Sequence, residues 1–243
     1  MHFFYVLVNG VTWKLASKLI SGTHKFEKTL NRIFNKFSKN NIFSNFKDEI
    51  TFKYIEQNKD YNLIIDSTDI INANCNKNEL GKSWKLHKQG IKATFIIDNN
   101  KVPIAYSLDN PTKHDCKVGY DLIMNSKLSN NKNKRLYVSA DKGYILNKKD
   151  SEMILKYKNI IFVTPKKKYK KSNKKNKYYK RKIVRHSKQM KEILKDRIYV
   201  EHFNSTLHRS YKRLDKIFDK SLNTFKTFID IALSIIILQK LVF

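Results

Sequence analysis

Cysteine, acidic side chains and long apolar runs are all scarce in this sequence. The two cysteines, Cys75 and Cys116, stand far apart and show none of the paired spacings that mark metal or redox motifs. A zinc site that combines them with His87 and His114 is the less favoured alternative. The scarcity of cysteine predicts a reduced, intracellular protein.

No apolar run is long enough to suggest a membrane span. The most apolar stretch, residues 231–239, has nine residues between Asp230 and Lys240, whereas a spanning helix needs about 20. The apolar start at residues 3–8 has no Lys or Arg before it, which argues against a secretory signal. We therefore expect no membrane partner.

Acidic side chains are outnumbered by basic ones. The 243 residues include 50 Lys and Arg but 21 Asp and Glu, which gives a net charge of +29. Such a chain is expected to bind polyanions, nucleic acid first and anionic membrane surfaces second. Because phosphate contacts release counterions, its affinity for DNA should fall steeply with added salt. The alternative is a gene of high A+T content, which enriches Lys, Asn and Ile without any binding role.

Residues 1–58 are expected to form a small helical region. Thr12 is a candidate N-cap of one helix, Gly22 ends it, and Thr23 is a candidate N-cap of the next. Two short helices around a Gly turn, one of them basic, predict a helix-turn-helix DNA reader. An ordinary helical hairpin with a solvated face is an equally good interpretation. The basic face consists of Lys25, Lys28, Arg32 and Lys36.

Residues 59–243 are expected to form an α/β domain with a mixed sheet of about five strands flanked by helices. The chain is 41% hydrophobic, with 15 Phe and 13 Tyr, which is enough for a core. Residues 98–101 predict a hairpin turn. The expected strands are residues 62–66, 91–97, 102–108, 135–141 and 160–163, and the expected helices are residues 115–128 and 147–157.

A basic loop is expected at residues 164–187. Residues 166–185 hold 12 Lys or Arg, with tyrosines between them and no apolar periodicity. The loop could grip a phosphate backbone while its tyrosines stack on bases; a merely solvated loop and a nuclear-import signal are the alternatives. A long C-terminal helical segment follows, with one helix across residues 193–214 and a buried last helix from Phe225.

Acidic residues follow two of the expected strands. Asp66 ends the first and Asp141 the fourth, and reactive groups in open α/β sheets gather just beyond strand ends. Two neighbouring carboxylates repel each other unless a cation lies between them, and oxygen ligands suit Mg²⁺ or Mn²⁺. A pair of such ions about 4 Å apart suits phosphodiester cleavage. Glu201 is the best-placed third carboxylate, and Arg197 precedes it by four residues on the same helix face.

Spacing alone leaves other acids as candidates, because an Asp at a strand end is more often a turn or cap residue than a metal ligand. Glu201 taken alone would be an ordinary surface acid. The rivals that this argument leaves open are Asp69, Asp98, Asp115 and Asp215.

Six short segments occur in a fixed order between residues 60 and 240. They are Asp66-Ser-Thr-Asp-Ile; residues 81–94 with 97–98 and 102–104; Asn110-Pro-Thr-Lys-His-Asp115; Ala140-Asp141-Lys-Gly-Tyr144; Pro165-Lys-Lys; and Arg197-Ile-Tyr-Val-Glu201-His-Phe203. Together they resemble the DDE transposases of bacterial insertion sequences, with the first, fourth and sixth segments similar to the three acid motifs of that family.

The resemblance implies a ribonuclease-H-like fold, two Mg²⁺ or Mn²⁺ ions, and DNA cleavage and strand transfer at the terminal inverted repeats of a mobile element. It also implies target DNA as a partner, a homodimer on paired ends, and a location with the DNA: the cytoplasm or nucleoid of a microbe, or the nucleus or viral factory for a viral protein. Asp66, Asp141 and Glu201 carry over as the catalytic, metal-binding acids. The expected DNA-binding or orienting residues are Arg197, His208, Lys166, Lys167, Lys168 and Arg181.

Two positions depart from the family pattern. Leu194 stands where Tyr is common, and His208 stands where Lys is common, seven residues after Glu201. Because imidazole is mostly neutral near pH 7, His208 should make a weaker phosphate contact. The alternative functions are therefore a catalytically decayed or domesticated DNA-binding protein of transposase origin and, third, a basic packaging protein that does not need the three acids to converge.

Overall fold

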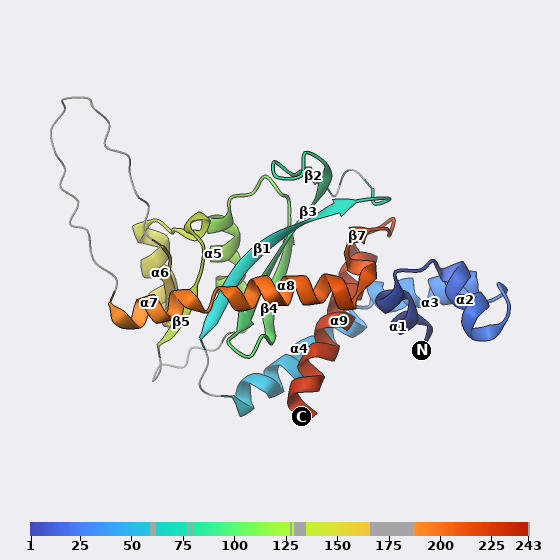
Figure 1. Cartoon of the computed structure of the whole chain (residues 1–243), viewed down its shortest axis with the longest axis horizontal. Helices are drawn as coiled ribbons and strands as arrows, with labels where there is room; N and C mark the ends of the chain where they lie inside the picture. The colour runs from blue at the N-terminus through green and yellow to red at the C-terminus, as the bar shows by residue number, and fades with distance from the viewer. Residues whose placement is uncertain are drawn as a thin grey trace.

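A mixed sheet forms the centre of the molecule, with helices on both of its faces (Figure 1). The central strand β1 (Leu63–Asn72) runs antiparallel to β3 (Gln89–Asp98) and parallel to β5 (Leu136–Ser139). Beyond β3 lies β4 (Pro103–Asp109), and beyond β5 lies β6 (Ile160–Val163). This computed structural model describes residues 1–58, 62–76, 78, 80–126, 128, 135–165 and 187–242.

Two short strands extend the sheet beyond the five that the sequence predicts. Strand β2 (Gly81–Lys82) pairs with the start of β3, and β7 (Lys216–Ile217) pairs with the end of β1. In the described part of the chain the sheet therefore contains seven strands, and the longer ones follow the order β4-β3-β1-β5-β6. The predicted α/β architecture is confirmed.

Strand β1 is longer than the apolar run at residues 62–66 predicts. The expectation that it ends at Asp66 is wrong, because its ladder with β3 runs from Leu63 opposite Asp98 to Ile71 opposite Gly90. The residues after Asp66 pair with β3 in the same register as the apolar residues before it. Asp66 therefore lies inside a strand, where its backbone is paired with Phe95 of β3.

Successive side chains of β1 enter two different cores, as the pleat of a strand requires. Ile64 belongs to a buried cluster that includes Phe203 of α8 (Ile198–Ser210). Ile65 belongs to a second cluster, which includes residues of α5 (Asp115–Asn125). Since alternate residues share a face, Asp66 lies on the α8 side of the sheet.

The hairpin predicted at residues 98–101 is confirmed. Lys101 adopts a left-handed φ of 63°, and its amide donates to the carbonyl of Asp98 at 3.0 Å. The fully buried Asp98 carboxylate accepts hydrogen bonds from the Val102 amide at 2.8 Å and from the Tyr54 hydroxyl at 2.6 Å. This acid thus closes the β3–β4 turn and attaches it to the preceding helix.

The helices expected near residues 115–128 and 147–157 are present as α5 and α6 (Lys148–Lys158). Helix α6 starts at the predicted position because Asn147 caps it, accepting a hydrogen bond from the Asp150 amide at 2.8 Å.

The N-terminal region is helical, as predicted. Thr12 caps the second helix by accepting from the Leu15 amide at 3.2 Å, and Gly22 ends it with a left-handed φ of 71°. The predicted cap at Thr23 is wrong, because the third helix begins four residues later and its N-cap, Phe26, makes no side-chain hydrogen bond. The four helices are α1 (His2–Asn9), α2 (Trp13–Ser21), α3 (Glu27–Lys39) and α4 (Ile42–Gln57).

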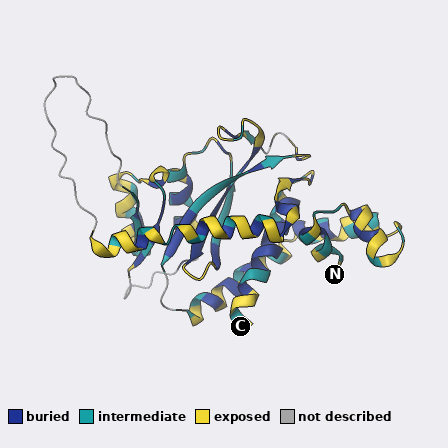
Figure 2. Cartoon of the chain, viewed as in Figure 1, coloured by how far each residue is buried: buried dark blue, intermediate teal, exposed yellow. Residues whose placement is uncertain are grey.

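Aromatic packing joins these helices to the C-terminal helix α9 (Leu222–Val242). The ring of Phe228 stacks on Phe34 with centroids 4.4 Å apart and on Trp13 with centroids 5.9 Å apart. Figure 2 shows α9 largely buried, in contrast to α8, which keeps an exposed face. The N-terminal helices therefore share a core with the end of the chain.

The helix expected across residues 193–214 is broken. Helix α7 (Lys188–Lys195) stops before Asp196, and α8 starts two residues later. The Asp196 side chain is hydrogen-bonded by Asn62, just before β1, which fixes the break against the sheet. A 3₁₀ turn (Lys212–Leu214) and β7 then separate α8 from the predicted buried last helix, α9. Within the described residues, no helix is long and apolar enough to cross a membrane.

Candidate active site

The pairing of β1 with β5 brings the first two predicted acids to the same level of the sheet. The two strands are parallel, and Ile64 is the partner of Ser139. Asp66 and Asp141 each lie two residues further along, on neighbouring strands that are spaced about 4.8 Å apart. Asp141 follows the end of β5, whereas Asp66 is still inside β1. The sheet topology thus brings together two residues that are 75 positions apart in the sequence.

Glu201 reaches the same region from α8. The helix lies across β1 (Figure 1), with Val200, Phe203 and Leu207 buried toward the sheet. Phe203 contacts the ring of Phe95 on β3 with centroids 5.4 Å apart. Glu201 lies in the first turn of α8 with its side chain exposed.

Asp66 is the electrostatic centre of the group. Burial raises the pKa of its carboxyl group, and the negative charges of Asp141 and Glu201 raise it further. The Ser67 amide and the guanidinium of Arg197 oppose this by stabilising the ionised form. The three predicted acids therefore share one electric field, and a cation among them would relieve their mutual repulsion.

Arg197 is the positive charge that the structure places in this field. Its Nη1 atom is 3.5 Å from Oδ1 of Asp141. The sequence predicts that Arg197 orients Glu201 or touches a phosphate, but its ion pair in the structure is with the second acid. The guanidinium side chain is 29% exposed and the Asp141 side chain 51%, so either can still contact a bound ligand.

The donor chemistry of the site fits a hard divalent cation, because all three acids offer carboxylate oxygens and Mg²⁺ and Mn²⁺ prefer oxygen. Across the described residues, no three His, Cys, Asp or Glu side chains are yet gathered closely enough to hold a metal ion. A metal pair held by these three acids would therefore need their carboxylates to come closer together than they lie in this structure.

Tyr144 connects the second acid to the first acid's strand. It lies in the 3₁₀ turn that follows Asp141, and its amide donates to the Asp141 carbonyl at 3.0 Å. Its buried hydroxyl shares a hydrogen bond of 2.5 Å with Ser67, which in turn contacts Thr94 on β3 at 2.7 Å. Burial raises the pKa of the Tyr144 phenol, so the hydroxyl stays neutral. The turn that carries Asp141 is thereby tied to the residue next to Asp66.

Two glycines make this connection possible. A Cβ atom on Gly119 of α5 would lie 2.8 Å from Cδ1 of Tyr144, which leaves no space for a side chain beside the ring. A Cβ atom on Gly143 would lie 2.7 Å from a carboxylate oxygen of Asp115. Asp115 in turn accepts a hydrogen bond of 2.7 Å from Lys92 on β3. The Gly and Tyr of the Asp-x-Gly-Tyr segment therefore have packing roles that sequence reasoning missed.

The four rival acids have other partners. Asp98 closes the hairpin, and Asp115 pairs with Lys92. Asp69 accepts a hydrogen bond from Ser83. Asp215 lies 3.3 Å from Nδ1 of His208, the residue expected to contact DNA. The charges with the largest effect on the pKa of Asp66 are those of Arg197, Asp141 and Glu201, whereas Asp115, beyond the effect of burial, acts together with Asp66 to raise the pKa of the Tyr144 phenol.

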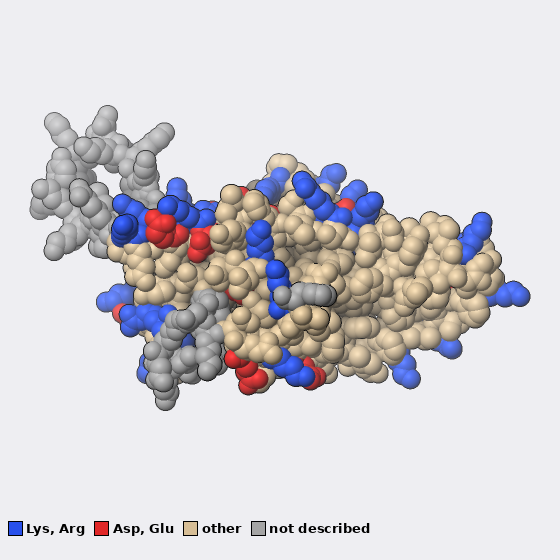
Figure 3. Space-filling view, turned by 60° about the horizontal axis from the view of Figure 1, so that its bottom comes forward, with Lys and Arg blue, Asp and Glu red and all other residues tan. Residues whose placement is uncertain are grey.

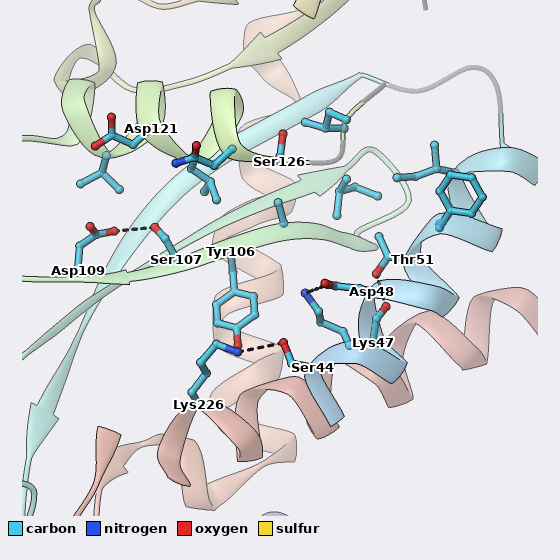
Figure 4. Close-up of a pocket in the computed structure, with 18 of the residues that line it drawn as sticks. Ser44, Lys47, Asp48, Thr51, Tyr106, Ser107, Asp109, Asp121, Ser126 and Lys226 are labelled. Carbon is cyan, nitrogen blue, oxygen red and sulfur yellow. Dashed lines mark hydrogen bonds and ion pairs between the residues drawn. The ribbon is translucent and has the colours of Figure 1, made fainter. Parts of the chain in front are cut away.

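A cavity of about 490 Å³ opens away from these acids, between α4, β4 and α5 (Figure 4). Lys47 pairs with Asp48 at 2.7 Å, and Lys113 pairs with Asp109 at 2.8 Å. Tyr106 points across it and donates to Asp230 at 2.7 Å. Lys226, which also lines the cavity, pairs with Asp230 at 3.0 Å, and none of the three predicted acids contributes to the cavity wall. No sequence signal pointed to this cavity.

The predicted phosphate-binding residues Lys166, Lys167, Lys168 and Arg181, in the basic loop at 164–187, lie outside the described residues. The role expected of these four residues therefore stays a prediction.

Comparison with known families gives a match to the Transposase DDE domain over residues 57–238, more than half of the chain. The chain belongs to this family, and the sheet and helices described above form its ribonuclease-H-like fold. No curated protein and no solved structure matches the chain.

Proposed function

We propose that this protein is a DNA transposase that hydrolyses phosphodiester bonds at the ends of a mobile element and joins the freed 3′ ends to target DNA. The observation that carries the proposal is the common field of Asp66, Asp141 and Glu201, centred on a carboxyl group whose pKa is raised by burial and by its two neighbours. Membership of the Transposase DDE domain family supports it.

The three acids would hold two Mg²⁺ or Mn²⁺ ions, which when bound activate the attacking water or 3′-hydroxyl and stabilise the leaving oxygen. Asp66 supplies the fixed carboxylate, because its backbone is held in the β1–β3 ladder. Arg197, freed from Asp141, would orient a phosphate of the scissile strand. His208 would contact the backbone when it is protonated and released from Asp215.

The DNA partners in this proposal are the terminal inverted repeats and the target duplex, with two copies of the chain acting on paired ends inside the cell. The end of the molecule formed by α2 and α3 shows Lys and Arg but no acidic side chain on the face drawn in Figure 3. This supports α3 as a DNA-binding helix. Its outer groove is lined by Lys28, Asn31, Arg32, Asn35, Lys36, Lys39 and Asn40.

Strand cleavage tests the catalytic proposal. Wild-type protein should nick a duplex that carries the element's inverted repeat when Mn²⁺ or Mg²⁺ is present, and Asp141→Asn should lower the rate by at least 100-fold, since a metal ligand is lost. Asp150→Asn is a matched control, because Asp150 is a partly exposed acid at the start of α6. Full activity in Asp141→Asn would refute the assignment of the site.

A DNA-binding protein of transposase origin without catalysis is the second candidate. Two observations favour it. No three acids of the described residues lie close enough to hold a metal ion. His208, at a position where the family commonly has Lys, contacts Asp215. Calorimetry with Mn²⁺ separates the two candidates. Intact DNA affinity without Mn²⁺ binding would establish the non-catalytic one.

A further inference from the structure

A buried amide oxygen on helix α8 has no hydrogen-bond partner. Oδ1 of Asn204 is buried, and within the described residues no group donates to it. A buried carbonyl oxygen without a donor costs folding free energy, so it calls for an explanation by strain, by water or by a bound ion. A hydroxyl can turn its proton toward a new acceptor, whereas an amide oxygen can be satisfied only by a donor or a cation.

Asn204 lies on the side of α8 that carries two residues of the candidate site. It follows Glu201 by three positions and Arg197 by seven, and these spacings place side chains on one side of a helix. Helical side chains lean back toward the N-terminus of their own helix. The Asn204 amide therefore leans toward the turn that carries Glu201.

The residue next to Asn204 places it at the level of Asp66 on the sheet. Phe203 is buried, and its ring contacts the ring of Phe95 with centroids 5.4 Å apart. Phe95 is the β3 partner of Asp66. The Glu201 side chain is exposed, whereas Asn204 is half-buried and its oxygen is fully covered. The amide oxygen thus lies deeper against the sheet than the third acid does, beside the strand pair that holds the first acid.

We propose that Asn204 is a fourth residue of the cation site, and that its Oδ1 atom is an oxygen ligand for a divalent cation held there. The inference rests on the proposed function for the presence of that cation. Carbonyl oxygen suits Mg²⁺ and Mn²⁺, as carboxylate oxygen does. The amide is neutral, so it adds a ligand without adding a negative charge to a site where Asp141 and Glu201 already act on Asp66.

Calorimetry with Mn²⁺ tests the proposal on the full chain without DNA. Asn204→Leu keeps the approximate size and shape of the side chain but removes the oxygen, and it should weaken Mn²⁺ binding by about 10- to 100-fold. Asn204→Asp keeps an oxygen at the same place and should restore the affinity at least to the wild-type value. Ser38→Ala is the matched control, because Oγ of Ser38 is also buried without a partner among the described residues but lies on α3, in the N-terminal helical region. It should leave the affinity unchanged.

Urea unfolding of the metal-free protein distinguishes a ligand from a structural residue. Asn204→Leu should leave the midpoint unchanged or raise it, because an apolar group of similar shape replaces an unpaired buried carbonyl. Ser38→Ala should behave in the same way. Asn204→Asp should lower the midpoint, since a further carboxylate is repelled by the three acids. Added Mn²⁺ should raise the midpoint of Asn204→Asp at least as far as that of wild type, because the ion binds the folded state.

Wild-type Mn²⁺ affinity in Asn204→Leu would overturn the proposal. Failure of Asn204→Asp to restore a lost affinity would also overturn it, because the oxygen would then not be the group that matters. Wild type that binds no Mn²⁺ would overturn it as well, and the cleavage assay would still decide the proposed function.

The two proposals can therefore fail separately. Mn²⁺ binding that depends on the oxygen of Asn204, without nicking of DNA, would refute the catalytic proposal alone. Nicking by wild type, together with unchanged Mn²⁺ affinity in Asn204→Leu, would refute this inference alone.

Discussion

The hydroxyl of Tyr144 provides a sharp test of how the second acid is positioned. Tyr144→Phe removes the hydrogen bond to Ser67 and keeps the ring that fills the space beside Gly119. Ser67 still has Thr94 as a partner at 2.7 Å, so no buried hydroxyl is left alone. We therefore expect a loss of about 1 kcal/mol in unfolding free energy, within the range for one buried hydrogen bond.

Two assays follow from this change. Urea unfolding should show a midpoint lower by about 0.3–0.5 M with an unchanged slope. Calorimetry at 25 °C should show Mn²⁺ affinity reduced by about ten-fold, the lower end for residues that hold metal ligands in place. Tyr157→Phe is the control, because Tyr157 is 45% exposed, in contrast to the buried Tyr144. It should change neither quantity.

The combination of results decides the interpretation. A loss of 1 kcal/mol leaves nearly all molecules folded, so the stability effect cannot by itself reduce Mn²⁺ affinity. Unchanged affinity in Tyr144→Phe, alongside the lowered midpoint, would refute a positioning role and leave Tyr144 as an ordinary core residue.

Three further perturbations test the packing and the buried charges. Gly119→Ala should lower the unfolding free energy by about 1–3 kcal/mol in urea titrations, because its Cβ would press against Tyr144; an unchanged midpoint would contradict that contact. Arg213→Met should cost about 3–5 kcal/mol in the same assay, since it leaves Asp219 buried without the Nη2 atom now 2.7 Å away, and the added change Asp219→Leu should recover most of the loss. Burial raises the pKa of Asp98, so its protonated form favours the folded state. The free energy of unfolding of wild type relative to Asp98→Asn is measured from pH 3 to pH 8. It should be greatest below the ordinary pKa of 3.8 and should fall as the pH rises through the folded pKa. An increase over that range would show that the folded pKa is lowered and not raised.

The parts of the fold that depend on local patterns were predictable from the sequence. The hairpin at residues 98–101, the cap at Thr12 and the strand near residues 160–163 all have near-neighbour signals, and all are confirmed. The errors occur where partners distant in the sequence decide the structure. Strand β1 continues beyond Asp66 because β3 pairs with it, and the helix expected across residues 193–214 breaks where Asp196 meets Asn62.

The candidate site shows the same division. Family resemblance selected Asp66, Asp141 and Glu201, and the structure places all three in one field. The resemblance could not give the partner of Arg197, because that contact depends on where α8 lies against the end of β5. The β2–β3 hairpin was recognisable as a family segment, but its hydrogen bond from Ser83 to Asp69 joins residues 14 positions apart in the chain, which the sequence pattern does not give.

The three acids differ in how freely they can move, and this difference constrains how a metal pair could assemble. Asp66 is paired with β3 on one side and adjoins β5 on the other, so its backbone position is largely fixed. Asp141 follows a strand end but is restrained through Tyr144. Glu201 is exposed on a helix and has the longest side chain of the three. If the three acids hold cations as proposed, Glu201 is the one that would move to close around them, and Arg197, whose positive charge acts on Asp66, would leave as it closes. Under the proposed function, the arginine would take the place of the cation beside Asp141 until substrate phosphates bind it.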